Sequence, residues 1–176
     1  MSASGSNAER SGPTEGTTDG PLVPSETSME EVRRSLEHVE LINVVPISIE
    51  ARTHGNPRPC TDVGFQVEMQ INSAPGFFGN RFKYEIELLD EDEEKTATLD
   101  FLLQVEYEVD DDVELESGVA EYIARTTGLF TAYPYARELA QTLSARLQQD
   151  PLVLGLMPRG ATGPGRISLA AKRTEP

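Results

Sequence analysis

One stretch of the chain alternates strictly between apolar and polar residues: residues 82–88, FKYEIEL. Successive side chains of an extended chain point to opposite sides, so its apolar residues share one face. Residues 65–71, FQVEMQI, repeat the pattern, and so do residues 101–109, FLLQVEYEV, with Leu102 as an exception. Such alternation indicates β-strands with one face in a core and the other in water.

A fourth alternating stretch, residues 39–52, comes first along the chain. Its residues Ile47, Ile49 and Ala51 share one face. Pro46 has no backbone N–H, so this strand is predicted to be an edge strand or to carry a bulge there. The four strands in a row predict an antiparallel meander, with residues 53–61 and 72–81 as connections and an acidic turn at 90–94.

The apolar spacing changes after the last strand. Residues 115–126 have helical spacing, and Gly128 is predicted to interrupt the helix. A longer helix is predicted to begin near Pro134, because proline is favourable at the first helical position, and to end by Pro151. The sequence therefore predicts an α+β fold, a four-stranded antiparallel sheet followed by two helices packed on one face. The predicted buried stripe of the longer helix is Ala136, Leu139, Ala140, Leu143 and Leu147.

The two ends of the chain have a different composition. Seventeen of the first 28 residues are Ser, Gly, Thr or Pro, which cannot bury enough apolar surface to offset chain entropy. We predict a disordered tail over residues 1–35, with a helical turn from Met29 to Leu36, one folded domain over 36–158, and a flexible basic tail over 159–176.

Charge excludes several kinds of partner. The chain has 30 acids and 15 bases, a net charge of −15, which repels nucleic acids and anionic membranes. Its one cysteine, Cys60, excludes an internal disulfide, and no apolar run approaches the roughly 20 residues that span a bilayer. Neither a signal peptide nor a membrane segment is expected, so the predicted location is the cytoplasm.

Sites for chemistry are not expected. The acidic runs 90–94 and 110–112 lack the glycine-turned loop of a calcium site, and His38, His54 and Cys60 are too few and too scattered for structural zinc. The chain has neither a phosphate-binding loop nor a nucleophile elbow. We expect no metal, no cofactor and no enzymatic activity; a metal-dependent hydrolase on the acidic strands is the last alternative.

The most specific motif is 127-TGLFTAYPYARE-138. It resembles the aromatic-Pro-Tyr-Ala-Arg-Glu signature that opens the long helix of SecB-family chaperones. Residues 47–51, ISIEA, and the apolar strip 152–157 match the order of parts in that family, so 36–158 resembles a SecB-like domain. The Tyr-Pro-Tyr form and the acidic flank look closest to the branch that accompanies toxin–antitoxin systems. The motif residues are Tyr133, Pro134, Tyr135, Arg137 and Glu138.

The resemblance implies an ATP-independent holdase. Members assemble as homotetramers, dimers of dimers, hold non-native polypeptides in apolar grooves, and pass preproteins to the ATPase SecA for export or protect an antitoxin. Besides these two chaperone roles, an oligomeric scaffold that binds no client stays open.

Candidate client contacts are large apolar residues in the predicted loops and in the strip. A holdase must keep such surface soluble, and residues 85–116, with 15 acids and only Lys95 as a base, supply the charge. The alternative interpretation of these residues is ordinary core cover, and of the acids a solvated face. The candidates are Phe77, Phe78, Leu129, Phe130, Leu152, Leu154, Leu156 and Met157.

Acids on the solvent face of the sheet bind the basic C-terminal segment of SecA in the SecB family. Glu50 falls on one such position. Pro46 and Phe101 stand where other acids are expected, and Asp100 or Glu106 could take that role.

Overall fold

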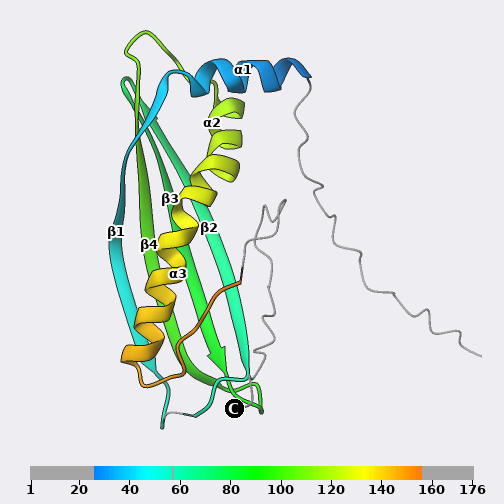
Figure 1. Ribbon diagram of the computed structural model, residues 1–176, viewed down its shortest axis with the longest axis vertical. Helices are drawn as coiled ribbons and strands as arrows, with labels where there is room; N and C mark the ends of the chain where they lie inside the picture. Colours follow the sequence, from blue (N-terminus) through cyan, green and yellow to red (C-terminus); the bar gives the residue numbers. More distant parts are fainter. Residues whose placement is uncertain (1–25, 57, 156–176) are drawn as a thin grey trace, which may run out of the picture.

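The computed structural model describes residues 26–56 and 58–155. A helix, α1 (Glu26–Leu36), precedes four strands, and the remaining helices follow them (Figure 1). The strands are β1 (Val39–Thr53), β2 (Asp62–Ala74), β3 (Phe77–Leu89) and β4 (Lys95–Val109). They form one antiparallel sheet, which confirms the predicted α+β class.

The strand order is β1-β4-β3-β2. The meander prediction holds for β2, β3 and β4 but is wrong for β1, which pairs with β4 instead of β2. Residues 54–61 can cross the end of the sheet because three strand spacings amount to only about 14 Å. Two backbone bonds fasten this crossing: the N–H of His54 donates to the carbonyl of Thr96 at 2.8 Å, and that of Thr61 to Leu89 at 2.8 Å.

Both predictions made from Pro46 are confirmed. β1 is an edge strand, and its register with β4 shifts between Pro46 and Ser48. A second shift lies between Leu41 and Asn43. β1 is therefore an irregular edge.

The expected connection at residues 72–81 is wrong, because β2 and β3 continue to within two residues of each other. Pro75 and Gly76 make the turn, and Gly76 has φ +73°, which only glycine adopts readily. Gly79 suggested a loop, yet it lies inside β3. A Cβ there would stand 2.9 Å from Cζ of Phe77, so this glycine makes room for the Phe77 ring.

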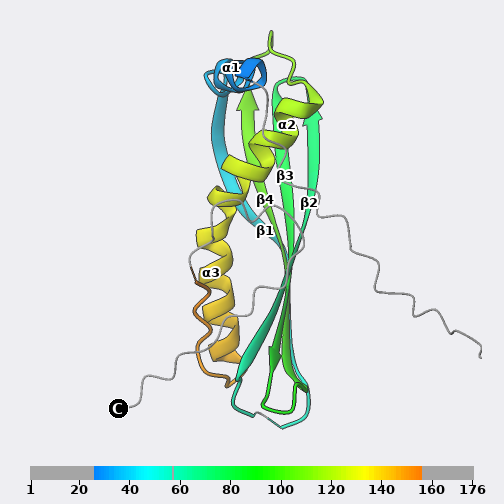
Figure 2. The ribbon, with the colours of Figure 1, turned by 90° about the vertical axis from the view of Figure 1, so that its right-hand side faces the viewer.

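One helical layer covers one face of the sheet (Figure 2). It consists of α2 (Ser117–Ile123), the π-helical segment η1 (Ala124–Gly128) and α3 (Leu129–Arg146), joined end to end. The predicted interruption at Gly128 is therefore wrong, and so is the predicted start at Pro134, which lies inside α3. Pro134 is exposed, where water can bond to the carbonyl that its missing N–H leaves without a partner.

Gly128 lies where the helical layer approaches the sheet most tightly. A Cβ at this position would stand 2.5 Å from Nδ2 of Asn80 and 3.3 Å from Cζ of Phe82. Close packing against the sheet thus requires glycine at position 128, and the helical layer continues through this residue.

The core lies between the helices and the two central strands. Alternate residues of β3 and β4 are buried, and Ala132, Ala136 and Ala140 of α3 are fully buried against them. These small side chains let the helix lie close to the sheet. Leu143 completes the predicted stripe as a buried residue, and Leu139 and Leu147 are partly buried.

Helix α1 lies across one end of the molecule, beside α2 (Figure 1). Its Val32 is buried, so ordered packing begins N-terminal to the boundary expected at residue 36. The expected disorder of residues 1–25 and the flexible tail 159–176 fall outside the described residues, and these boundaries stay predictions.

Candidate functional site

Large apolar side chains are exposed along β1. Leu41, Ile42, Ile47 and Ile49 are each about half exposed, Ile42 most at 57%. Ile42 and Ile47 lie at the two register shifts, where a residue has no opposite partner on β4. None of the residues of β1 is buried, so this strand leaves apolar surface at one edge of the sheet.

The opposite edge, β2, has a graded apolar row on the face that the helices cover. Val63 and Phe65 are buried, Val67 and Met69 are partly buried, and Ile71 is 38% exposed. Burial along this row therefore decreases from the first half of β2 to the second. Sequence alternation placed these residues on one face but could not show that the row becomes exposed.

The segment after α3 folds back along the helix on the β2 side (Figure 1). Leu154 is buried, Leu152 is partly buried, and Val153 between them is 63% exposed. The N–H of Leu152 donates to Oγ of Ser144 at 2.8 Å. Leu152 and Leu154 of the predicted apolar strip thus contribute to the core, and Val153 between them is exposed to solvent.

Tyr133 of the motif fastens this segment. Its hydroxyl donates to the carbonyl of Gly155 at 2.6 Å, and burial raises the pKa of this phenol. Tyr135 is about half exposed. Arg137 is partly buried and Glu138 is exposed, so these two adjacent charged side chains lie in different environments. The motif therefore acts partly by holding residues 152–155 against α3.

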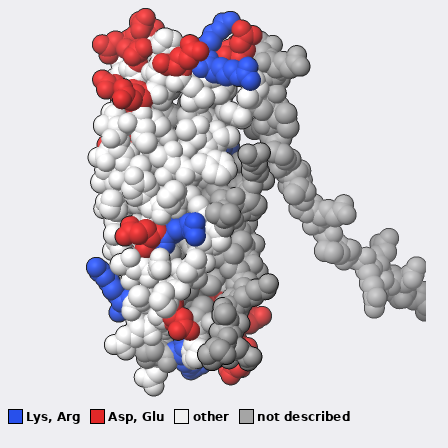
Figure 3. All heavy atoms as spheres, in the orientation of Figure 1, with Lys and Arg blue, Asp and Glu red and all other residues white. Residues whose placement is uncertain are grey.

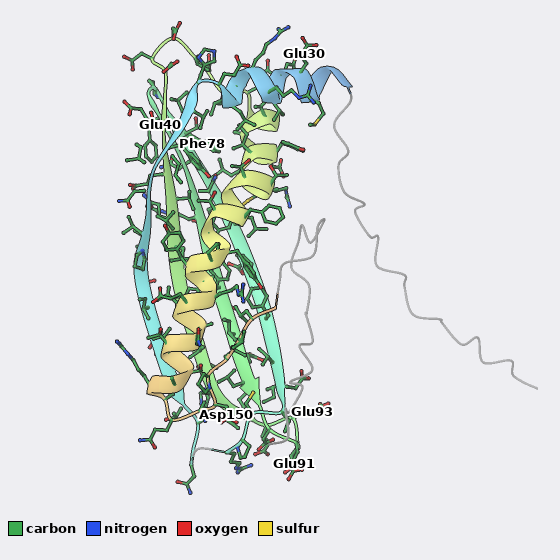
Figure 4. All side chains as sticks on the ribbon, in the orientation of Figure 1. Glu30, Glu40, Phe78, Glu91, Glu93 and Asp150 are labelled. Atoms are coloured by element: carbon green, nitrogen blue, oxygen red, sulfur yellow. The ribbon has the colours of Figure 1, made fainter. Side chains whose placement is uncertain are left out.

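The prediction that Phe78 contacts clients is wrong. It is 0% exposed, and its ring lies 5.5 Å from that of Tyr107. Figure 4 shows Phe78 toward the end of the molecule that also carries Glu40. The two-residue turn brings Phe78 into β3 and onto the helix-covered face, which leaves no surface for a client. Phe77, on the other face, is partly buried over Gly79.

The other candidate contacts have different environments. Phe130 is half exposed, Leu129 packs partly against the core, and Leu156 and Met157 lie outside the described residues. The structure does not gather all the candidates in one place. Leu129 and Phe130 lie on α3, and Leu152 and Leu154 follow the helix after it has turned back.

The outer face of the sheet carries a row of carboxylates. Asp100 on β4 lies opposite Glu50 on β1 and Glu85 on β3. Partial burial, followed by Glu85 and Glu50, raises the pKa of Asp100. Glu106 lies elsewhere, opposite Asn43, so two of the three predicted partner-binding acids come together and Glu85 joins them unpredicted.

Acids also gather at one end of the molecule, and the middle of the helix-covered side carries few charges (Figure 3). His38, before β1, pairs there with Asp110 after β4, Nδ1 to Oδ2 at 2.8 Å. The N–H of Asp110 also donates to the carbonyl of His38 at 3.2 Å. The side-chain hydrogen bond between the His38 imidazole and the Asp110 carboxylate raises the pKa of His38.

The described residues contain no group of three or more His, Cys, Asp or Glu arranged to hold a metal ion. None of the helices in the described part of the chain is long and apolar enough to cross a membrane. Cys60 is half-buried, and burial raises the pKa of its thiol.

Comparison with known proteins gives a match in structure alone. No protein-family profile and no curated protein matches the sequence. The solved structure of the Mycobacterium tuberculosis Rv1957 SecB-like chaperone, in complex with a ChAD peptide from the Rv1956 HigA1 antitoxin, superposes with a TM-score of 0.67 at 23% identity. The match covers 73% of this chain and 98% of that chain. A protein of unknown function from Streptococcus agalactiae gives a TM-score of only 0.39 at 8% identity, over 67% of this chain and 97% of that one. The chain described here has the fold of a SecB-like chaperone.

Proposed function

We propose that this protein is an ATP-independent chaperone that holds unfolded polypeptides on apolar surface at the margins of its sheet. The observation that carries the proposal is the exposure of large apolar side chains on and beside the β2 edge, Ile71 on β2 at 38% and Phe130 on α3 at 50%. Exposed apolar patches on a soluble protein commonly mark binding sites. The role needs no catalytic residue and no cofactor.

Acidic charge supports this role by keeping the particle dispersed. The net charge of −15 opposes self-association, and the carboxylates of Glu50, Asp100 and Glu85 lie on the outer face of the sheet, opposite to the face that carries the apolar row of β2. The same charge favours clients with a basic character. Work in the cytoplasm, where unfolded chains are made, fits this proposal.

The two edges suit different partners. The half-exposed residues of β1 would pack against a second copy, as the first step toward a tetramer built as a dimer of dimers. The client surface would then lie on the other side of α3, with Leu129, Phe130 and Leu152 as contacts. Phe77, Leu154, Leu156 and Met157 are weaker candidates, the first two because they are largely covered.

Two chaperone roles have specific support. In export, the carboxylates Glu50 and Asp100, with Glu106 further along β4, would bind the basic segment of SecA. The complex of the M. tuberculosis protein with an antitoxin peptide favours the second role, protection of an antitoxin. A pull-down with the SecA C-terminal segment, and an assay with any antitoxin encoded beside this chain, separate these roles.

The test is suppression of aggregation. An unfolded model protein is diluted into buffer without nucleotide, and light scattering is followed at increasing ratios of chaperone. Suppression of aggregation at stoichiometric ratios supports a holdase, and an absence of suppression supports a scaffold. The double variant Phe130→Ser with Ile71→Ser should suppress several-fold less, whereas Thr127→Ser with Gln141→Ser, at exposed polar residues of the helical layer, should match the wild type.

A further inference from the structure

The two edges of the sheet differ in their backbone. β1 has Pro46 and two register shifts. β2 pairs with β3 over 13 consecutive residues, from Asp62 to Ala74, without any shift. A client strand needs a regular row of backbone groups, and β2 has one where β1 does not.

β2 also has few of the devices that protect edge strands. Natural edges are commonly blocked by lysine, proline, a bulge or a covering element. Residues 62–74 contain no Lys, Arg or Pro, and in the described part of the chain only β3 pairs with β2. The second half of β2 is the open half, because residues 70–74 are all exposed.

We propose that residues 66–74 of β2 accept an extended segment of a client as a fifth strand of the sheet. The inference rests on the proposed function and adds the mode of binding. Backbone hydrogen bonds hold a segment of any sequence, and side chains on the two faces select among sequences. A holdase for many clients needs this combination.

The two faces of β2 specify the chemistry of that segment. Val67, Met69 and Ile71 form an increasingly exposed apolar row on the helix-covered face, which suits apolar residues at alternate positions of the client. The other face has Gln66, Glu68 and Gln70, all exposed.

Glu68 selects for positive charge on this second face. Lys83 lies opposite it on β3, but the ammonium of Lys83 pairs with Glu85, so Glu68 has no ion pair among the described residues. A Lys or Arg of the added strand would meet this carboxylate. The preferred ligand is thus an extended segment of alternating apolar and polar residues with a basic residue among the polar ones.

Backbone methylation of a peptide tests this mode. The probe is a synthetic nine-residue peptide in which Ile or Val alternates with Ser around a central Lys, and its affinity is measured by fluorescence anisotropy. In a strand, the N–H groups of alternate residues point to the same side. One derivative is N-methylated at the apolar residues and the other at the polar residues.

One methylated derivative should lose at least tenfold in affinity, and the other should stay within about threefold of the parent peptide. Equal affinities of the two derivatives, whether kept or lost, would overturn the inference. Failure of the parent peptide to bind a protein that still suppresses aggregation would overturn it as well, and would leave the proposed function intact. A fall in particle mass when peptide is added would assign this edge to a second copy and also refute a client strand.

Cross-linking locates the strand. In a Cys60→Ser background, Gln70→Cys on β2 should form a disulfide with a peptide that carries a central Cys, and Ser48→Cys on β1 should not. Glu68→Lys should weaken the Lys peptide and strengthen one with a central Glu. Equal capture at both edges would refute binding at β2.

Discussion

Replacement of Phe78 by alanine should destabilise the fold. Phe78 is fully buried and its ring lies 5.5 Å from that of Tyr107 at an interplanar angle of 31°. Phe→Ala changes in a core cost about 3–5 kcal/mol, which includes the cavity that remains. A domain of this size has a total stability of about 5–15 kcal/mol, so Phe78→Ala would lose a large part of it.

Urea unfolding followed by circular dichroism measures the effect. Phe130→Ala is the matched control, because Phe130 is half exposed and should change stability by less than about 1 kcal/mol. If Phe78→Ala does not fold, Phe78→Leu keeps most of the volume and should cost about 1–1.5 kcal/mol. An unfolding free energy for Phe78→Ala within about 1 kcal/mol of the wild type would refute the buried position of this ring.

Three other changes test separate contacts. Ala136→Leu should lower stability by about 1–3 kcal/mol in the same urea assay, because the residue is fully buried between α3 and the sheet. Tyr133→Phe removes the bond to Gly155 and should cost about 0.5–1.5 kcal/mol, with faster hydrogen exchange in residues 150–155; unchanged exchange would contradict the bond. Since Asp110 raises the pKa of His38, this pair stabilises the fold fully below the unfolded pKa and loses its effect as pH rises through the raised folded value. From about pH 6 to 8 the wild-type Tm should therefore fall relative to that of His38→Gln, and parallel profiles would exclude the pair as the cause.

Alternation of apolar and polar residues predicted the strands well but not their neighbours. It places a side chain on a face, and that face is the same whichever strand lies beside it. Only β1 was misplaced, because the loop 54–61 is long enough to reach either the adjacent position or the far edge. The Pro75–Gly76 turn carried a local signal, but the glycine at 79 obscured it.

Glycine and proline misled the helix prediction for a related reason. Gly128 and Pro134 usually mark helix ends when only local propensity acts. Here Gly128 lies against Asn80, and this contact between residues far apart in sequence decides its role. The candidate site residues could not be predicted fully for the same reason, since the exposure of Ile42 and the burial of Phe78 depend on which strands are paired.

The distribution of buried residues explains how one small domain can be stable and still leave apolar surface for binding. β3 and β4 alternate buried and accessible residues over nearly their whole length, whereas β1 has no buried residue and β2 has them only near its start. The free energy of folding therefore comes mainly from the two central strands and the alanine face of α3. Polar substitutions at Ile47 or Ile71 remove less buried area than substitutions of the fully buried residues of β3 and β4, so binding can be changed at the edges at a smaller cost in stability. The proposed client strand at β2 is compatible with this separation, because an added strand would extend the sheet and leave the central packing unchanged.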